Sequence, residues 1–352
     1  MNLESIQQAI RDAAARRTPL RLRGGGSKDF YGNEPRGELL DTRGYAGIVA
    51  YEPTELVVTA RCGTRLTELE AALAEAGQCL PFEPPHFGEE ATLGGCVAAG
   101  LSGPRRASAG ALRDYLLGAR IVDGRGRALS FGGQVMKNVA GYDVSRVLAG
   151  SLGTLGFIAE VSLKVLPRAT AEQTLRLEMP QAEAIDALNR WAGKPLPLSA
   201  SAWHAGVLWL RLEGRVAALE PAAAQIGGER VDAAKAAPFW KSIREHAYDF
   251  FGGAAPLWRL AVPGTTPPLD VPGSQLLEWG AGLRWLKSDG EPGIIRDAAR
   301  RAGGHATLFR AARKATEAFT PLAPVAQRLH RELKSAFDPA GILNPGRLYP
   351  DL

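Results

Sequence analysis

The sequence contains only three cysteines, Cys62, Cys79 and Cys96, and no two of them are spaced as in a CxxC motif. Such an odd and scattered set argues against a disulfide framework or a zinc cluster, and it indicates a reducing compartment such as the cytoplasm. The five histidines are also scattered, without HxH or HxxxH spacing. The sequence therefore gives no support for a metal site.

Long hydrophobic runs are missing as well. No apolar stretch approaches the about 18 residues that a membrane-spanning helix needs. The first ten residues include Glu4 and two glutamines and have no unbroken apolar core, so they do not form a secretory signal. Leu3, Ile6 and Ile10 are instead spaced as the apolar stripe of a short amphipathic helix.

The charge balance is basic, with a net charge of +5 and a pI near 9.2. This balance favours anionic partners such as phosphates, carboxylates or acidic surfaces. The arginines are spread along the chain, and we find no nucleic-acid-binding motif. We therefore expect a small anionic ligand rather than a nucleic acid.

A length of 352 residues suggests two domains. Strand-like and helix-like segments alternate up to Pro167, and these include a helix capped by Thr64, a hairpin over residues 115–131 and a half-buried strand over 157–166. Beyond Pro167 the glycine motifs disappear, and further strands (174–178, 207–212, 257–262) and helices (182–191, 292–302) follow. We predict one domain over 1–168, a second over 169–335, and a tail, 336–352, that folds back onto the first.

Three glycine-rich segments dominate the first domain. Residues 23–28 read Arg-Gly-Gly-Gly-Ser-Lys after a predicted strand, and consecutive glycines can turn their amides inward to bind an anion. Residues 91–103 are mostly small, and Thr92 can cap a short helix there. The third segment, 137–158, carries Gly150, Gly153 and Gly156 at intervals of three.

Each segment has a plain structural alternative. The first can be a flexible loop with chance charges, the second a site of tight helix packing, and the third a turn between a helix and a strand. Arg113 and Asp114, which follow the second segment, can form an ordinary surface ion pair. Three such segments in one domain nevertheless favour a site where the backbone lies against a large, flat, phosphate-bearing ligand.

The set resembles the FAD-binding domain of the vanillyl-alcohol-oxidase/p-cresol-methylhydroxylase (PCMH) superfamily, and within it the D-2-hydroxyacid dehydrogenase branch. The third segment matches that branch at Lys137, Gly141, Tyr142, Asp143, Gly150, Ser151, Gly153, Thr154, Leu155, Gly156 and Ile158. The tail 337–346 is similar to the C-terminal signature of the family. The chain length and the sequences of these motifs most resemble those of the smaller FAD-binding subunits of bacterial glycolate oxidases.

This resemblance implies a PCMH-type α+β fold with a smaller α+β cap, and noncovalent FAD lying between the two domains. It implies that residues 23–28 and 92–95 hold the pyrophosphate, that 150–158 lie near the flavin ring, and that the tail closes over the flavin edge. The implied cofactor-binding residues are Arg23, Gly24, Gly25, Gly26, Ser27, Lys28, Thr92, Leu93, Gly94, Gly95, Ser102, Gly103, Gly110, Arg113, Asp114, Gly150, Ser151, Gly153, Thr154, Gly156, Ile158, Asn344 and Arg347.

Several positions depart from the family pattern. Leu152 stands where the family has an acid, and Arg347 stands where it has a lysine. The second domain has no HxxGDGNxH-like cluster, which supplies substrate and metal ligands in catalytic members. The remaining candidates for a catalytic role are Arg259, Arg284 and His305. Either arginine could clamp a carboxylate, but a structural or interface role is the more common one for such residues.

The function implied by the resemblance is that of an FAD-binding subunit in a multi-subunit glycolate, or D-2-hydroxyacid, oxidase. Its implied partners are a larger paralogous FAD-containing catalytic subunit and an iron–sulfur subunit, with at most peripheral contact to the inner face of the cell membrane. Two alternatives remain open. One is a self-sufficient FAD-dependent D-2-hydroxyacid dehydrogenase, and the other is a non-catalytic scaffold subunit that has kept the fold.

Overall fold

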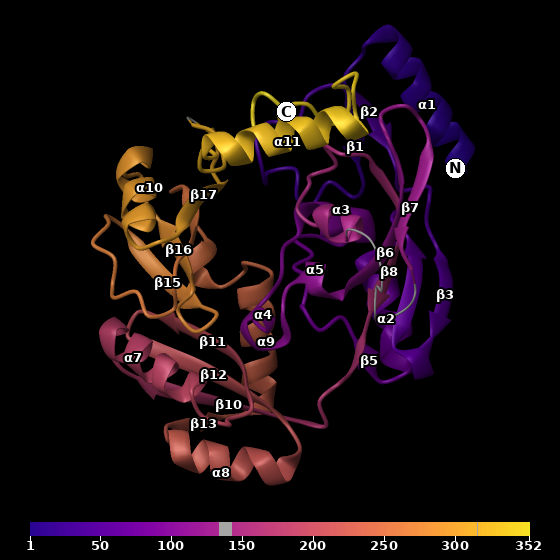
Figure 1. The fold of residues 1–352 in the computed structure, drawn as a ribbon. Helices are drawn as coiled ribbons and strands as arrows, with labels where there is room; N and C mark the ends of the chain where they lie inside the picture. Colours follow the sequence, from indigo (N-terminus) through magenta and orange to yellow (C-terminus); the bar gives the residue numbers. More distant parts are fainter. Residues whose placement is uncertain (134–142, 315) are drawn as a thin grey trace.

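The computed structural model describes residues 1–133, 143–314 and 316–352, and its ribbon divides into two lobes (Figure 1). The first lobe is built on an antiparallel sheet of five strands in the order β3-β4-β8-β6-β7. Its strands are β3 (Ile48–Glu52), β4 (Val57–Arg61), β6 (Leu116–Val122), β7 (Ala128–Gly132) and β8 (Phe157–Lys164). The predicted hairpin over 115–131 corresponds to β6 and β7, which pair directly.

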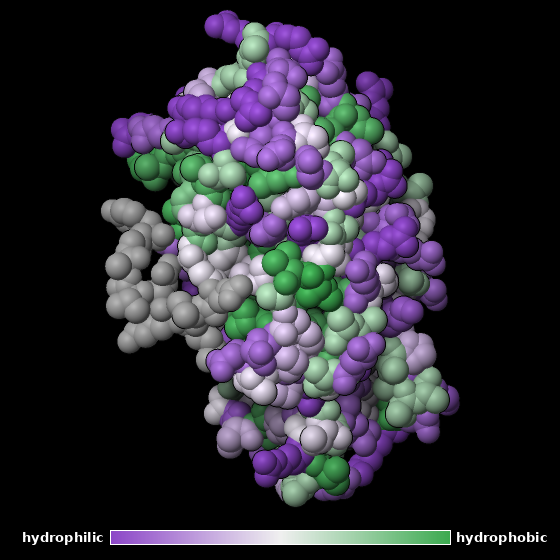
Figure 2. Space-filling model, turned by 90° about the vertical axis from the view of Figure 1, so that its right-hand side faces the viewer, coloured by the Kyte–Doolittle hydropathy of each residue, from purple (hydrophilic) through white to green (hydrophobic). Residues whose placement is uncertain are grey.

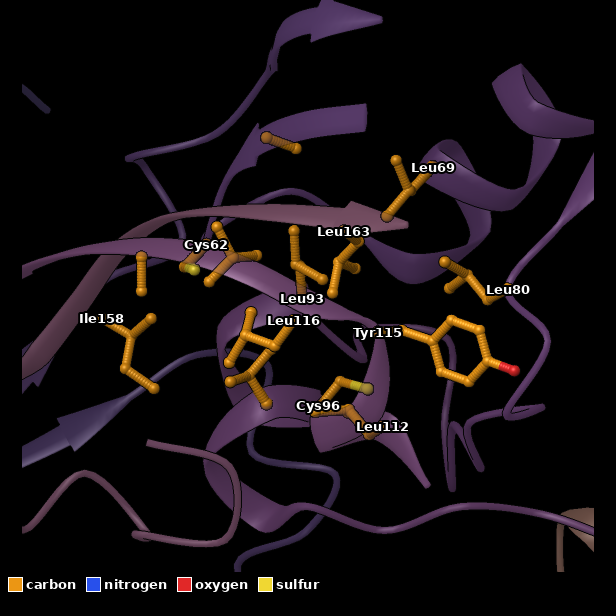
Figure 3. Close-up of a cluster of buried hydrophobic side chains, with 14 of the residues drawn as sticks. Cys62, Leu69, Leu80, Leu93, Cys96, Leu112, Tyr115, Leu116, Ile158 and Leu163 are labelled. Carbon is orange, nitrogen blue, oxygen red and sulfur yellow. The ribbon is translucent and has the colours of Figure 1, made fainter. Parts of the chain in front are cut away.

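The central strand β8 is more buried than its sequence pattern predicts. The alternation over 157–166 is typical of a half-buried strand, but six of the eight residues of β8 are buried. Hydrophobic clusters account for this, because Leu163 packs with the core around α2 (Leu66–Glu75) and α3 (Leu93–Ala99), whereas Phe157 packs with α1 (Leu3–Arg16). Figure 3 shows Leu69, Leu93 and Leu163 among the side chains gathered in the larger cluster.

The cap predicted for α2 is wrong. The N-cap residue is Arg65, which makes no side-chain capping bond. The hydroxyl of Thr64 instead accepts a hydrogen bond from the amide of Gly47 at 2.8 Å, and Thr64 is fully buried. The same leucines that predicted the helix do pack inward, because Leu66, Leu69 and Leu73 are all fully buried.

The N-terminal and C-terminal parts of the chain pack against each other in the first lobe. β1 (Leu20–Arg23) pairs in parallel with β2 (Glu38–Asp41), and Leu20 also forms a bridge with Leu343. Ile342 and Leu343 share a hydrophobic cluster with α1. The helix α11 (Pro324–Phe337), which precedes this tail, lies across the top of Figure 1 and spans from one lobe to the other.

The second lobe holds an eight-stranded antiparallel sheet in the order β13-β10-β12-β11-β15-β16-β14-β17. Its strands are β10 (Ala171–Glu178), β11 (Leu198–His204), β12 (Val207–Gly214), β13 (Glu229–Val231), β14 (Leu257–Ala261), β15 (Ser274–Glu278), β16 (Leu283–Lys287) and β17 (His305–Arg310). Its helices are α7 (Gln181–Ala192), α8 (Val216–Ile226), α9 (Ala233–Arg244) and α10 (Pro292–Arg301). The strands and helices predicted beyond Pro167 are all present as β10, β12, β14, α7 and α10.

Short elements complete the chain. These are the 3-10 helices η1 (Pro53–Glu55) and η2 (Asp249–Phe251), the helices α4 (Arg106–Ala109), α5 (Leu112–Tyr115) and α6 (Val144–Val147), and the strands β5 (Gln78–Cys79) and β9 (Leu166–Pro167). The predicted domain boundary near 168 falls between β9 and β10, and it stays a prediction.

A network of buried charges joins the lobes. The guanidinium of Arg211, on β12, donates to both carboxylate oxygens of Glu83 in the first lobe at 2.9 Å each. Arg211 also lies 3.0 Å from Glu213, and Glu213 lies 2.8 Å from Arg105 of the first lobe. Losing one partner of a buried ion pair leaves an uncompensated charge and strongly destabilises a protein, so this network favours one arrangement of the two lobes.

On one side of the first lobe, the described residues form no broad hydrophobic face. Figure 2 presents the side on the right of Figure 1, and there hydrophobic residues form small patches among hydrophilic ones. Within the described residues, no helix is both long enough and apolar enough to cross a membrane.

Candidate cofactor-binding site

One pocket in the first lobe brings together all three glycine-rich segments and the C-terminal tail. Its empty volume is about 820 Å³, part of which is open to solvent. The predicted residues that line it are Arg23, Gly24, Gly25, Gly26, Ser27, Lys28, Thr92, Gly94, Gly95, Gly153, Gly156, Ile158, Asn344 and Arg347. Of residues 169–335, as far as they are described, none lines the pocket. We expected the cofactor between the domains, but this pocket belongs to the first lobe and the tail.

The first glycine segment forms a loop with free amides. Among the described residues, the N–H groups of residues 24–28 donate to no other protein group. The chain packs too closely here for side chains, because a Cβ on Gly25 would lie 1.5 Å from the carbonyl oxygen of Glu90, and Gly26 has a φ of +71°. A row of unused amides on a glycine loop is the donor set that a phosphate or diphosphate requires.

Lys28 adds a positive charge that has no carboxylate at ion-pair distance within the described part of the chain, although Glu245 acts on it from further away. Its ammonium donates to the carbonyl oxygen of His86 at 3.1 Å and to the hydroxyl of Ser27 at 3.4 Å. Burial lowers the pKa of Lys28 from its ordinary value. Arg23 differs, because its Nε donates to Asp29 at 2.8 Å. An anion in the pocket would therefore stabilise Lys28 most directly.

The second segment contributes the start of α3. Thr92 caps this helix as predicted, with its hydroxyl accepting from the amide of Gly95 at 3.3 Å. Gly94 lies so close to Cys62 that a Cβ on the glycine would be 2.8 Å from the Cβ of that cysteine. Burial raises the pKa of the neighbouring Cys96 thiol to about 12, so that thiol is unreactive at neutral pH.

The third segment and the tail are interlocked. Asn344 accepts a hydrogen bond from the amide of Leu22 at 2.7 Å and donates to the carbonyl oxygen of Leu152 at 2.6 Å. A Cβ on Gly153 would lie 2.7 Å from the Asn344 amide nitrogen. Arg347 is buried and donates to the carbonyl oxygens of Asn33 and Asp29, and burial lowers its pKa to about 10. The matched residues Lys137, Gly141 and Tyr142 lie outside the described residues.

Nine of the residues predicted to bind the cofactor lie away from this pocket. They are Leu93, Ser102, Gly103, Gly110, Arg113, Asp114, Gly150, Ser151 and Thr154. Leu93 is buried in the hydrophobic core, and Thr154 donates to the backbone of Ser151 at 2.8 Å. Asp114 accepts from the amide of Ala111 at 2.8 Å. Ser102 and Gly103 instead line a second, smaller pocket.

This second pocket, which we call the inter-lobe pocket, is lined by residues of both lobes. From the first lobe come Pro85, Phe87, Leu101, Ser102, Gly103 and Pro104; from the second come Ile243, Arg244, His246, Arg259, Glu278, Trp279, Trp285 and Phe309. Of the three catalytic candidates, Arg259 lines it. The sequence analysis missed His246 and Glu278, because neither belongs to a motif.

The other two candidates are placed differently. Arg284 is fully buried, and its guanidinium donates to the carbonyl oxygens of Ala281, Pro267 and Thr266. These bonds lie within the second lobe and favour a structural role, and Arg284 lines neither the first pocket nor the inter-lobe pocket. Its candidacy as a carboxylate clamp stays a prediction. His305 is exposed at the start of β17, opposite Ala261 in the sheet, and it lines neither of these two pockets.

The described residues contain no group of three or more His, Cys, Asp and Glu side chains that could hold a metal ion. The first pocket, by contrast, fits the diphosphate part of a dinucleotide well. Its free amides, the ammonium of Lys28 and the close-packed glycines supply donors, charge and room for one anionic group.

Comparison with known proteins gives a consistent result. Residues 1–132 match the FAD binding domain family, and residues 312–348 match the C-terminal domain of FAD linked oxidases. Glycolate oxidase subunit GlcE of Escherichia coli (strain K12) is 49% identical over 350 residues, which cover 99% of this chain and 97% of that protein. D-lactate dehydrogenase of Archaeoglobus fulgidus is 31% identical over 56% of this chain and 45% of that protein.

Two further relatives extend the comparison. Glycolate oxidase subunit GlcD of Bacillus subtilis (strain 168) is 29% identical over 49% of this chain and 37% of that protein. Among solved structures, an alkyldihydroxyacetonephosphate synthase superposes with a TM-score of 0.70 at 16% identity, covering 97% of this chain and 75% of that one. At such low identity this likeness shows the fold alone, and it confirms the predicted fold class.

Proposed function

Because this chain belongs to the family of FAD-linked oxidase subunits that includes glycolate oxidase subunit GlcE, we propose that it is the FAD-binding subunit of a multi-subunit oxidase acting on glycolate or a related D-2-hydroxy acid. The relationship to GlcE runs over nearly the whole length of both chains. The single structural observation that carries the proposal is the glycine loop with free amides beside the ammonium of Lys28, which has no ion-pair partner among the described residues.

In this proposal the chain's own residues bind and orient the cofactor. The amides of residues 24–28 and the ammonium of Lys28 hold the diphosphate, and Thr92, Gly94 and Gly95 form the opposite wall. Asn344 and Arg347 hold the tail against β1 and so close the pocket. FAD, when bound, supplies the capacity to accept a hydride from the hydroxyl-bearing carbon of the substrate.

The electrons must then leave the chain through a partner. Three cysteines are too few for a four-cysteine iron–sulfur cluster. We therefore assign onward transfer to an iron–sulfur subunit and the main oxidation step to a larger paralogous FAD subunit resembling GlcD. A cytoplasmic location, with at most peripheral contact to the inner membrane face, completes the proposal; cell fractionation tests it.

The first experiment is to purify the chain alone, record its visible spectrum and add glycolate without oxygen. We expect flavin bands that stay oxidised until the partner subunits are added. Bands that bleach with glycolate alone would make the chain a self-sufficient dehydrogenase. The absence of flavin bands, with full activity of the complex retained, would overturn the cofactor role and leave a scaffold.

A further inference from the structure

The second lobe, as far as it is described, does not line the first pocket, but one of its carboxylates bonds to a segment that contacts the glycine loop. Glu245 directly follows α9, and its Oε2 accepts hydrogen bonds from the backbone amides of His86 and Phe87 at 3.0 and 2.9 Å. Its Oε1 accepts from Nε of Arg244 at 2.7 Å, so both oxygens of the carboxylate are held. A residue of the second lobe is thereby tied to the backbone of the first.

The same segment, residues 83–88, which we call the 83–88 loop, contacts two donors of the first pocket. The carbonyl oxygen of His86 accepts from the hydroxyl of Ser27 at 2.7 Å and from the ammonium of Lys28 at 3.1 Å. The ring of Phe87 lies 5.7 Å from the same ammonium, within the range of a cation–π contact. Ser27 and Lys28 line the first pocket, whereas His86 and Phe87 do not. The 83–88 loop therefore influences where these two donors are held.

The backbone of the 83–88 loop has an unfavourable conformation at two positions. Glu83 and Phe87 have φ angles of +45° and +53°, which residues with a side chain rarely adopt. Such a conformation persists where surrounding contacts fix it, and here charged groups of the second lobe bond to both residues. Arg211 donates to the carboxylate of Glu83 at 2.9 Å, and Glu245 accepts from the amide of Phe87. The conformation of this loop therefore depends in part on the second lobe.

We propose that Glu245 is a positioning residue for the cofactor, which fixes Ser27 and Lys28 through the 83–88 loop for binding of the diphosphate. The hydrogen bonds and the backbone of the loop carry the coupling itself, whereas the identity of the ligand as FAD rests on the proposed function. The second lobe thus controls the affinity of a pocket that its described residues do not line. Because such coupling is reciprocal, bound FAD favours the arrangement of the lobes in which Glu245 holds the loop.

The test compares FAD binding by the unmodified full chain and its variants, measured by flavin fluorescence titration. Glu245→Ala leaves two amides without their acceptor, and we expect it to weaken FAD binding by about tenfold. Glu245→Gln keeps an oxygen that can accept from both amides, so it should bind FAD almost as tightly as the unmodified chain. Glu183→Ala, at an exposed position of α7, is the matched control and should leave FAD binding unchanged.

A double-mutant cycle separates positioning from a general loss of stability. Lys28→Met removes one of the groups through which Glu245 acts, so Glu245→Ala should weaken FAD binding less in the Lys28→Met background than in the unmodified chain. Thermal melts establish that each variant folds. If Glu245→Ala does not fold, Glu245→Asp, whose side chain is one methylene shorter, takes its place and should change FAD affinity in the same direction.

Hydrogen exchange on the FAD-free chain gives a readout that needs no cofactor. The amides of His86 and Phe87 should exchange faster in Glu245→Ala than in the unmodified chain, because their acceptor is gone.

The outcomes distinguish this inference from the proposed function. An unmodified chain that binds FAD, together with a Glu245→Ala chain that binds it equally well, would overturn the inference and leave the proposed function standing. The inference would also be overturned if Glu245→Gln bound FAD as weakly as Glu245→Ala, or if the loss were equal in the two backgrounds of the cycle. An unmodified chain that binds no FAD would overturn the proposed function and the inference together.

Discussion

At the scale of single residues, Lys28 combines two opposing effects. Its ammonium is partly withdrawn from water and donates to a carbonyl oxygen, but no carboxylate lies at ion-pair distance from it in the described structure. Such a charge destabilises the protein without its ligand and strengthens the binding of an anion. The two effects can be separated by one substitution.

We predict that Lys28→Met raises the free energy of unfolding of the FAD-free chain by on the order of 1 kcal/mol, and weakens FAD binding by about tenfold to a hundredfold. Thermal denaturation and flavin fluorescence titration measure the two quantities. Lys235→Met, on the exposed side of α9, is the control. A variant that binds FAD as tightly as the unmodified chain would contradict the role given to Lys28.

Glu278 makes stability depend on pH. Burial raises its pKa to about 7 from an ordinary value of 4.5, so between these values the folded state binds more protons than the unfolded state. Stability from this group is therefore full below about pH 4.5 and falls as the pH rises to about 7, by up to about 3 kcal/mol in total.

The measurement compares the unmodified chain with Glu278→Gln by chemical denaturation at about pH 5 and about pH 8. We expect the unmodified chain to lose stability relative to the variant at the higher pH. If both proteins change in parallel, Glu278 does not carry the effect.

The residues of the two pockets differ in how far sequence could reveal them. The glycine segments are local, so their amides and Thr92 could be predicted from neighbouring residues. His246 and Glu278 are far apart in the sequence and line one pocket only in the folded chain, so no local pattern marks them. Arg284 looked like a clamp because sequence does not show that three carbonyl oxygens surround it.

At the scale of elements, the first glycine loop depends on close packing as much as on ligand contact. A Cβ on Gly25 would lie 1.5 Å from the backbone of Glu90, whereas a Cβ on Gly293 in α10 would meet nothing within 4 Å. The same substitution should therefore have opposite effects at these two positions.

We predict that Gly25→Ala destabilises the chain by about 3 kcal/mol through overpacking, and that Gly293→Ala stabilises it by about 0.5 kcal/mol through reduced freedom of the unfolded chain. Differential scanning calorimetry of both variants measures this. Similar melting temperatures for the two would show that the loop can move aside.

The helices and strands themselves were largely predictable, because the apolar residues that repeat periodically in the sequence are the ones buried in the structure. Leu66, Leu69 and Leu73 predicted α2 correctly. The sequence could not show the tertiary contacts. The hydroxyl of Thr64 accepts a hydrogen bond from the amide of Gly47 instead of capping α2, and β8 is a central, largely buried strand. Both differences arise from neighbours that are remote in the sequence.

At the scale of the whole molecule, the lobes are joined by charges that are hidden from water. Arg211 is 4% exposed and pairs with Glu83 of the other lobe and Glu213 of its own. Removing it would leave two carboxylates partly buried without their main partner. Arg230 and Glu220, a pair of exposed residues in the second lobe, offer the contrast.

We predict that Arg211→Met lowers the free energy of unfolding by about 3–5 kcal/mol, and that Arg230→Met changes it by less than about 1 kcal/mol. Urea denaturation followed by tryptophan fluorescence measures both. An Arg211→Met chain that unfolds like the Arg230→Met control would mean that this charge network does not hold the lobes together.

The interlock of β1 with the tail also bears on how the protein is made. The hydrogen bond between Leu22 and Asn344 spans 322 positions, and a ribosome adding about 5–20 residues per second needs roughly 15–60 s to cover that distance. Through that interval the nascent first lobe lacks the residues that complete the wall of its pocket. If FAD binds in this pocket, we expect its capture in the final place only after synthesis has passed Arg347.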